Sequence, residues 1–495
     1  MENMNDYHPE TSGNIPRRRV SWFAILSVAV LSFTAGLIVT YALFELERTV
    51  VVDGIDDVVD EDDLADLLLV LNELENDHYF FNEDNDLIRG AIEGMIAATG
   101  DGYTNFFSLS DFEGAMSHLR ETFYGIGAEV TTINGDTTIV APMPGSPAEH
   151  YGVLSGDVVI SVDGEDVRDE FLGDVISKIR GEYGTVVTLG ILRAGSDFIY
   201  IDVTRGEIVN ETVTTDILES DDGKVIGYLR VSTFGEATLR DFRYAIEELE
   251  KEEIDGLIVD VRNNSGGYLS AVTGMVSYML PSDLLITSAV DRDGREIPHY
   301  TSGNASQRLD VDIVTLINGG SASASEIFAA AMIESGGFEV VGTTSFGKGT
   351  VQQSRPIRDD GMLQMTIQVW KTPDGHLIEG YGVEPTVEVE ASDFVGILQV
   401  SLGDEDVLTY DMVHPGIESS QQILDAIGYD VDRTDGFFDS STEGALEEFQ
   451  ANNDLEVTGE IDGATASALS MALRDIVRDP GYDTQIQAAL ALFND

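Results

Sequence analysis

The pattern of apolar and polar positions divides the chain into segments of different period. Between residues 45 and 118, apolar side chains recur at i, i+3 and i+4, as in "DLADLLLVLNELEN" and "LIRGAIEGMIAA", which predicts amphipathic helices. Between residues 119 and 207 the pattern alternates and contains the hairpin signal Asn134-Gly135, which predicts short strands. We therefore expect a helical region followed by a mainly β domain.

Residues 208–395 alternate strand and helix signals. The apolar runs "KVIGYLRVSTF", "GLIVDVRNN", "VDIVTLIN" and "FEVVGTT" predict buried strands, and "TLRDFRYAIEELEKEE" and "LSAVTGMVSYML" predict helices between them. This order indicates an α/β domain with a parallel sheet. Beyond it we expect a linker over 396–415, a small helical module over 416–475 and a helical tail over 476–495.

An uncharged apolar run covers residues 20–44, directly after Arg17, Arg18 and Arg19. It is longer than the ~20 residues that a membrane span needs, and no clear cleavage site of small residues lies near its end. We predict an uncleaved single-pass anchor in the cell membrane, with residues 1–19 in the cytoplasm and the rest of the chain outside. A cleaved signal peptide is the alternative.

Composition and charge narrow the class of protein. A chain of 495 residues with 43% apolar residues suits several globular domains, and the lack of cysteine excludes disulfides and thiolate chemistry. A net charge of −63 argues against nucleic acid as a partner. An acidic surface with so little lysine predicts a halophilic protein. The chain has five lysines, namely Lys178, Lys224, Lys251, Lys348 and Lys371.

The stretch "LINGGSASASEIFAAAM" holds three serines at alternate positions, Ser321, Ser323 and Ser325. Ser323 and Glu326 fit the S-x-x-E capping box, so the start of a helix is enough to explain the run. On this stretch alone, a capping role is favoured over that of a nucleophile.

Lys348 in "SFGKGTVQQ" lies between two glycines after an apolar strand. Burial in such surroundings lowers the pKa of a lysine, and a neutral amine can accept the proton of a serine where no histidine is near. Gln352 could hold that amine through its side chain. The alternative for Lys348 is a surface lysine in a turn.

The segments "YGIGAEV" and "SPAEHYGVLSGDVVISVDG" resemble a PDZ domain. Such a domain binds a peptide as an added edge strand and holds its terminal carboxylate on backbone N–H groups. Those groups would come here from Gly125, Ile126, Gly127 and Ala128, where glycine permits close approach.

Four motifs, "GLIVDVRNNSGGYLSAV", "LINGGSASASEIFAAAM", "VVGTTSFGKGTVQQ" and "WKTPDGHLIEGYGVEPTVEV", resemble those of the carboxyl-terminal processing peptidases, a serine–lysine family, and the similarity extends over residues 65–475. The resemblance implies a multidomain α/β protein with a crotonase/Clp-protease-like core. It implies Ser323 as nucleophile, Lys348 as base and Gln352 as the residue that orients the base, and no metal or organic cofactor. Ser321 and Ser325 keep structural roles.

An oxyanion hole needs backbone N–H groups where negative charge develops. Ala324, directly after Ser323, can supply one at the helix N-terminus, and the resemblance places the second in the turn with Gly266 and Gly267, without deciding between them. The family has a proline where this chain has Ser265, a weak rival nucleophile. Because both glycines remain, we expect the turn to survive.

Arg180 ends the expected PDZ helix, and an arginine in this region links peptide occupancy to the catalytic geometry in the family. A solvated arginine at a helix end is the alternative. Residues 416–475 resemble the peptidoglycan-binding module of cell-wall enzymes, with a three-helix fold that retains no ligand as the alternative. The run "DVDRTDG" within it does not suit calcium, since the glycine falls one place late.

These features predict a membrane-anchored serine endopeptidase outside the cytoplasm. We expect it to process or degrade proteins with apolar C-terminal tails, with peptidoglycan as a further partner and a homodimer as a candidate assembly. A non-catalytic scaffold built on an inactive peptidase core is the first alternative. An acyl-CoA enzyme, which would share the core fold, is the second, and the anchor and the PDZ domain argue against it.

Overall fold

The computed structural model describes residues 61–494, apart from 82–85, 134–135, 144, 155, 169, 171, 194–196, 304–308, 359–360, 399, 401 and 403–406. The predicted cytoplasmic tail and membrane span, residues 1–19 and 20–44, lie outside this part, as does the predicted hairpin turn. Among the described residues, no helix is long and apolar enough to cross a membrane. The chain divides into two compact units, Met1–Ala91 and Ile92–Asp495.

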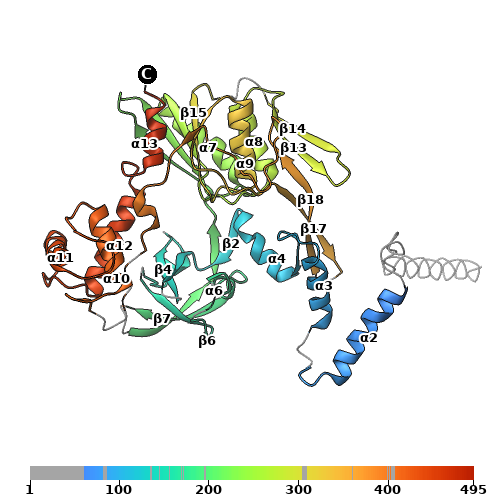
Figure 1. Ribbon diagram of the computed structural model, residues 1–495, viewed down its shortest axis with the longest axis horizontal. Coiled ribbons are helices and arrows are strands. Elements are labelled where there is room, and N and C mark those ends of the chain that lie inside the picture. The colour runs from blue at the N-terminus through green and yellow to red at the C-terminus, as the bar shows by residue number, and fades with distance from the viewer. Residues whose placement is uncertain are drawn as a thin grey trace, which may run out of the picture. The chain divides into compact units, whose positions relative to one another are not determined.

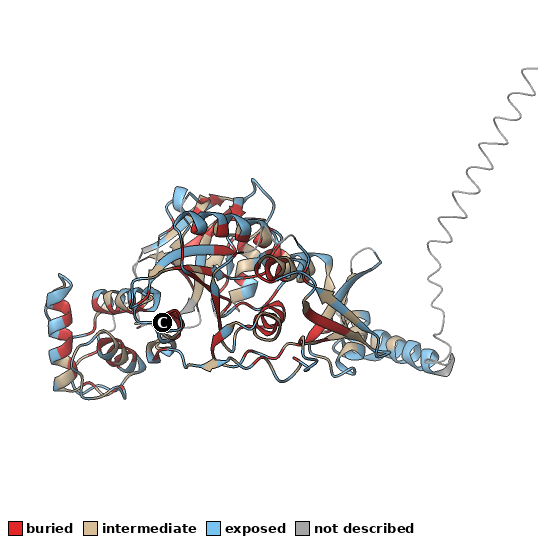
Figure 2. Cartoon of the chain, turned by 90° about the horizontal axis from the view of Figure 1, so that it is seen from above, coloured by how far each residue is buried: buried red, intermediate tan, exposed pale blue. Residues whose placement is uncertain are grey.

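In the first unit, the main described element is the helix α2, Glu61–Asp77 (Figure 1). The helix was predicted, but its apolar stripe is exposed: Leu64, Leu67 and Leu68 are 52%, 52% and 56% accessible, and α2 is pale blue in Figure 2. The helix α3, Leu87–Ala97, also follows the predicted pattern.

Residues 122–209 form the mainly β domain that the alternating pattern predicts. Its larger sheet has the strand order β3-β4-β5-β7-β8 with β6 beside β5, and β2 pairs separately with β9. Ile139, Val159 and Leu189 are fully buried in its core. The elements are β2 (Thr122–Gly125), β3 (Ala128–Ile133), β4 (Asp136–Pro142), α5 (Pro147–His150), β5 (Val158–Val162), β6 (Glu165–Asp166), α6 (Leu172–Ile179), β7 (Val186–Arg193), β8 (Asp197–Thr204) and β9 (Gly206–Val209).

The α/β core has a six-stranded sheet in the order β10-β11-β12-β15-β16-β19. All neighbours pair in parallel except β10 and β11, which confirms the predicted parallel sheet. The strands are β10 (Val213–Glu219), β11 (Val225–Val231), β12 (Gly256–Asp260), β15 (Asp312–Ile317), β16 (Glu339–Gly342) and β19 (Val387–Glu388). Helices α7 (Thr238–Lys251), α8 (Leu269–Met279) and α9 (Ala324–Ala330) share one apolar cluster with this sheet.

A second sheet was not predicted. It has the order β1-β18-β13-β14 with β17 also paired to β18, and its strands are β1 (Asn105–Ser108), β13 (Leu285–Asp291), β14 (Glu296–Tyr300), β17 (Thr350–Ile357) and β18 (Gly361–Lys371). The helical prediction for residues 45–118 is therefore wrong at β1, although the helix α4, Leu109–Met116, follows directly. The partner of β1 lies more than 250 residues away in sequence, so no local period reveals the strand.

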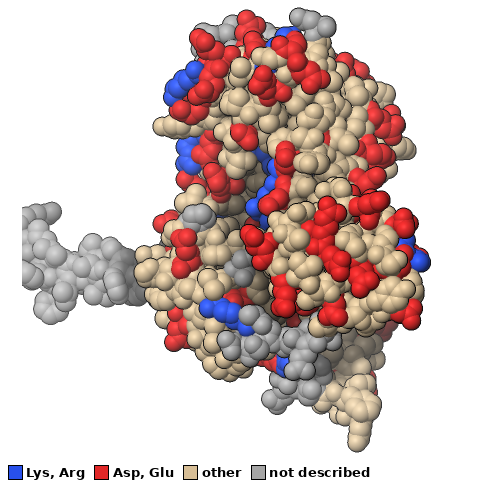
Figure 3. Space-filling view, turned by 90° about the vertical axis from the view of Figure 1, so that its left-hand side faces the viewer, with Lys and Arg blue, Asp and Glu red and all other residues tan. Residues whose placement is uncertain are grey.

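The C-terminal module has three helices with an apolar core of their own, α10 (Pro415–Ala426), α11 (Ser440–Asn452) and α12 (Gly463–Arg478). Asp439 and Asp462 cap α11 and α12 by accepting from the N–H groups of Thr442 and Thr465. A further helix, α13 (Thr484–Ala491), packs on the core sheet. Figure 3 shows one face of the molecule with carboxylates spread over much of it and basic groups in few places, as the composition predicts.

Candidate active site

The turn after strand β12 forms one wall of the site. Asn264 is fully buried, and its side chain accepts from the Gly266 N–H at 2.9 Å and donates to a carbonyl of β11 at 2.9 Å. Gly266 and Gly267 have φ angles of 112° and 140°, and a Cβ on Gly267 would lie 2.3 Å from the carbonyl oxygen of Phe234. Only glycine fits here, so the turn keeps its expected form although Ser265 replaces the proline.

The three serines of the run differ in accessibility. Ser321 and Ser325 are fully buried and donate to backbone carbonyls of that turn, at 2.8 Å to Val261 and 2.7 Å to Asn264. Ser323 is partly exposed and is the N-cap residue of α9, with φ at 54°. This left-handed conformation costs a non-glycine residue about 1–3 kcal/mol, so the surroundings must hold it. Of the three, only Ser323 is open to a substrate.

A buried carboxylate joins the serine run to the lysine loop. Oε2 of Glu326 accepts from the N–H of Ser323 at 2.7 Å and from that of Lys348 at 2.8 Å. Oε1 accepts from the Gly347 N–H at 2.7 Å and from the Ser345 hydroxyl at 2.6 Å. Burial raises the pKa of Glu326, and these hydrogen bonds oppose the rise. Sequence reasoning identified only the capping contact, because the other donors lie more than 18 residues further along.

Lys348 lies in the environment that the sequence suggested. Burial lowers the pKa of its ammonium, and the charges of Glu379 and Glu326 oppose that shift. The Nζ atom lies 4.9 Å from the ring centroid of Tyr103, a cation–π contact. The lysine is therefore partly desolvated, which suits a base, and its charged form has an aromatic partner.

Sequence reasoning missed Tyr103. The turn that carries it is fixed by Asp101, which accepts from the Tyr103 N–H at 2.9 Å and from the Thr104 hydroxyl at 2.6 Å. Thr104 in turn accepts from the N–H of Thr366 on β18 at 3.2 Å. The only local signal is an Asp-x-Tyr-Thr turn, and nothing in it indicates a lysine almost 250 residues away.

Gln352 does not make the expected contact. Its side-chain amide donates to the hydroxyls of Thr350 at 2.8 Å and Thr366 at 3.3 Å, and no hydrogen bond to Lys348 is found among the described residues. The pairing of β17 with β18 shifts register between Val351 and Gln352. This irregularity places both threonines within reach of the amide.

Two backbone N–H groups beside Ser323 have no partner in the described part of the chain, those of Gly267 and Ala324. The N–H of Gly266 already donates to Asn264. The turn and the helix start touch, because a Cβ on Gly266 would lie 3.1 Å from the nitrogen of Ala324. Unoccupied donors at a helix N-terminus can stabilise negative charge on a substrate oxygen.

The predicted carboxylate loop lies between β2 and β3. Gly127 has a φ of 72°, and a Cβ there would lie 2.6 Å from that of Ser146. Within the described residues, the N–H groups of Ile126 and Gly127 have no partner, and Gly125 and Ala128 end and begin the flanking strands. The loop thus presents free donors, as a carboxylate site requires.

Arg180 is not the solvated arginine of the alternative interpretation. Its guanidinium lies 4.5 Å from the ring centroid of Phe123 and donates to the hydroxyl of Ser117. These contacts lie in a cavity of about 980 Å³ that also includes Glu236 of the core domain. The arginine therefore connects the end of α6 with the segment that leads into the β domain.

Comparison with known proteins defines the class. Three family models match, namely peptidase family S41 over residues 225–389, the PDZ domain over 138–193 and the peptidoglycan binding domain over 413–469. The chain is a PDZ-containing peptidase with a peptidoglycan-binding domain.

Relatives specify the family. The chain is 36% identical over 420 residues to the carboxy-terminal processing protease CtpB of Bacillus subtilis (strain 168), covering 84% of this chain and 86% of that protein. Its identity to CtpA of the same organism is 31% over 420 residues, covering 84% and 87%. The solved photosystem II D1 C-terminal processing protease matches at 27% identity and a TM-score of 0.43, covering 66% of this chain and 86% of that one. This chain belongs to the carboxy-terminal processing serine proteases of family S41.

Proposed function

We propose that the chain cleaves proteins by a serine–lysine mechanism, with Ser323 as nucleophile and Lys348 as general base. The observation that carries the proposal is the accessibility of Ser323, which alone of the three serines is partly exposed and lies at the start of α9. Ser323 would attack the scissile carbonyl, and neutral Lys348 would take the hydroxyl proton and return it to the leaving amine. Water would then hydrolyse the acyl-enzyme.

The oxyanion of this reaction would rest on the N–H groups of Ala324 and Gly267. Gly267 is preferred to Gly266 because the Gly266 N–H is already engaged by Asn264. With Lys348 over the ring of Tyr103 and Gln352 bonded to two threonines, the arrangement is that of a resting enzyme. Activation would bring Lys348 and Gln352 together beside Ser323.

The substrates we propose are proteins with apolar C-terminal tails. The tail would pair with the β domain, and its carboxylate would bind to the loop of Gly125, Ile126, Gly127 and Ala128. Arg180 would report occupancy of the loop, because its partner Phe123 lies two residues before Gly125.

The setting we propose is extracytoplasmic, with residues 20–44 as a single-pass anchor. The module at 416–475 would hold the enzyme near peptidoglycan, and a homodimer is the proposed assembly. The high density of carboxylates suits a medium of high ionic strength.

The test compares the wild-type chain with Ser323→Ala, Lys348→Ala and the control Ser265→Ala on a protein substrate that ends in an apolar tail. We expect both active-site variants to lose cleavage by at least about 10³-fold and Ser265→Ala to retain it. A substrate whose tail ends in two aspartates should be cleaved poorly. Cleavage that survives Ser323→Ala would refute the mechanism and favour the scaffold alternative.

A further inference from the structure

The segment after the peptidoglycan-binding module belongs structurally to the peptidase core. It follows residue 469, so neither the peptidase nor the peptidoglycan-binding family model includes it. Its helix α13 lies on the face of the core sheet opposite α7, α8 and α9 (Figure 1). The apolar cluster there joins side chains of four parallel strands with those of α13, namely Ile226, Ile258, Val314, Leu316 and Val341 with Ile486, Ala489, Leu490 and Phe493. The helix supplies the layer that keeps this face of the sheet from water.

The module is consequently inserted into the core, and the chain passes twice through one neck. We define the neck as residues 389–392, which leave the core, and residues 482–485, which return to it. The two passes are hydrogen-bonded to each other: Ser392 donates to the Tyr482 carbonyl at 2.7 Å, Thr484 to the Glu390 carbonyl at 2.7 Å, and Gln485 to the Val389 carbonyl at 2.8 Å. The neck therefore links the module to the core by two hydrogen-bonded passes of the chain.

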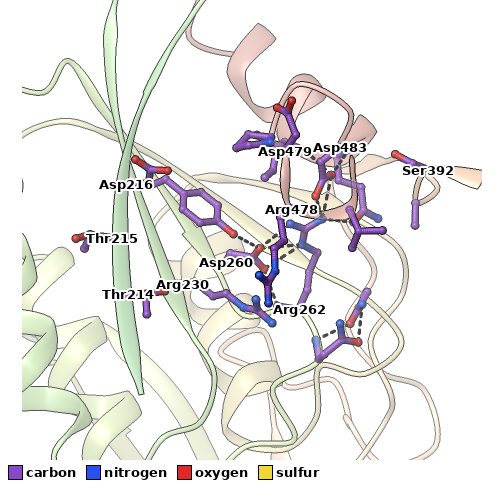
Figure 4. A pocket seen from close by; sticks show the side chains of 18 of the residues that line it. Thr214, Thr215, Asp216, Arg230, Asp260, Arg262, Ser392, Arg478, Asp479 and Asp483 are labelled. Atoms are coloured by element: carbon purple, nitrogen blue, oxygen red, sulfur yellow. Dashed lines mark hydrogen bonds and ion pairs between the residues drawn. The ribbon is translucent and has the colours of Figure 1, made fainter. Parts of the chain in front are cut away.

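The returning pass of the neck is bound to Arg262, which lies in the turn after β12. The terminal nitrogen Nη1 of Arg262 donates to both carboxylate oxygens of Asp483, at 2.8 and 3.1 Å, and to the side-chain oxygen of Gln485 at 2.8 Å. Its other nitrogens donate to Asp260, at 2.6 to 3.0 Å. Figure 4 shows Arg262 between the two aspartates, among the side chains that line a pocket of about 530 Å³. The guanidinium side chain is only 14% exposed, so water does not replace these partners.

Arg262 is also close in sequence to the groups that shape the turn with Gly266 and Gly267. Val261, directly before it, accepts from the Ser321 hydroxyl, and Asn264, two residues after it, accepts at its carbonyl from the Ala322 N–H at 3.0 Å and from the Ser325 hydroxyl. The side chain of Asn264 engages the Gly266 N–H. The route from Asp483 to the unpaired N–H of Gly267 thus runs through one largely buried arginine and five residues of backbone.

We propose that Asp483 is a positioning residue for the oxyanion turn, acting through Arg262, and that the neck makes the geometry of this turn depend on the peptidoglycan-binding module. The proposal rests on the serine–lysine chemistry proposed above. Asp483 has two roles that can be separated. As the N-cap of α13 it accepts from the N–H groups of Gln485 and Ile486, and as an anion it holds Arg262. Asparagine preserves the first role, because it caps helices as well as aspartate does. It weakens the second role, because it carries no negative charge to hold Arg262.

The experiment compares Asp483→Asn with Asp479→Asn in the full chain. Asp479 belongs to the same segment and lines the same pocket, but its carboxylate accepts from Gly481 and not from Arg262. Cleavage of a fluorogenic peptide with an apolar tail is followed at saturation and in a single turnover, and the melting temperature of each variant is recorded. For Asp483→Asn we expect kcat and the acylation rate to fall about 10–100-fold, as small displacements of catalytic groups do, with KM within about twofold of wild type. Asp479→Asn should match the wild type.

The double variant Arg262→Lys with Asp483→Asn should lose no more acylation rate than Arg262→Lys alone, because both substitutions disrupt the same contact, that between Arg262 and Asp483. Additive losses would overturn the proposed route, and so would equal kcat values for Asp483→Asn and Asp479→Asn. Should Asp483→Asn fail to fold, Gln485→Met tests the same link with the cap intact, and an unchanged kcat there would overturn the inference. An inert wild-type chain would instead contradict the proposed function, so the two failures are distinguishable.

Discussion

Replacing Glu326 by glutamine tests the site closely, because it replaces one carboxylate oxygen by an NH₂ group and leaves the volume of the side chain almost unchanged. The carboxylate accepts four hydrogen bonds in a fully buried position, two on each oxygen. The favoured amide orientation keeps oxygen toward the N–H groups of Ser323 and Lys348. The NH₂ group then faces Ser345, whose hydroxyl can turn to accept, and Gly347, whose N–H cannot.

The expected loss follows from those contacts. One hydrogen bond to a charged group contributes about 1.5–3 kcal/mol, and a buried N–H left without a partner costs about 1–3 kcal/mol. Removing the charge also relieves the desolvation that raises the pKa of Glu326, which offsets part of this. We expect the free energy of unfolding to fall by about 2–4 kcal/mol. Because Gly347 precedes Lys348, kcat should fall about 10–100-fold.

Urea unfolding and steady-state cleavage of an apolar-tailed peptide measure the two effects. Glu334→Gln is a matched control, since Glu334 lies in the short π-helix that continues α9, Ala331–Ser335, and accepts a single backbone N–H, that of Asp374, at 2.7 Å. If Glu326→Gln equals Glu334→Gln in both stability and kcat, Glu326 does not hold the serine run and the loop of Lys348 together, and our interpretation of its four hydrogen bonds is wrong.

Three further outcomes follow from the site and the surface. Because burial lowers the pKa of Lys348 below 10.5, the unfolded chain binds more protons than the folded one between the two pKa values, and the cost of the buried ammonium to stability is largest at low pH. Lys348→Met should therefore raise the melting temperature at pH 7, and this gain should shrink toward pH ~10.5. A gain that does not change with pH would contradict this. Tyr103→Leu removes the ring that favours the charged form of Lys348, so the acid limb of kcat/KM should move to lower pH, while Tyr103→Phe leaves it in place. The carboxylates of Glu326, Glu379 and Asp101 are unchanged in both variants. Equal pH profiles for the two variants would exclude an effect of the cation–π contact. Stability should rise with KCl up to about 2 M as carboxylate repulsion is screened, and a melting temperature independent of salt would refute adaptation to salt.

Local patterns predicted the elements whose partners are close in sequence. The parallel strands β11, β12, β15 and β16 were evident as apolar runs, because both faces of each strand are covered. The need for glycine in the turn after β12 was also predicted, and a side chain at Gly267 would collide with backbone there. The family resemblance selected Ser323 from three similar serines, and accessibility is the physical property that distinguishes it.

The rest depends on contacts that sequence spacing does not encode. Tyr103 reaches Lys348 because β1 pairs with β18, and Glu326 gathers donors from a loop some twenty residues further on. The helix α13 looked like a tail because its partners, the strands of the core, precede it by up to 260 residues. The role of Gln352 stays a prediction, since its amide donates here to the hydroxyls of Thr350 and Thr366.

The two glycines around Lys348 have a role that the motif alone conceals. A Cβ on Gly349 would lie 2.1 Å from the nitrogen of Glu379, and one on Gly347 would lie 3.2 Å from the nitrogen of Gly382. The loop therefore packs backbone against backbone on residues 379–382, and the Gly380 N–H donates to the Gly347 carbonyl at 2.9 Å. Burial of the lysine follows from this close packing, because any larger neighbour would lift the loop and admit water. The glycines thus favour the burial that lowers the pKa of Lys348, by letting the two backbone segments approach closely.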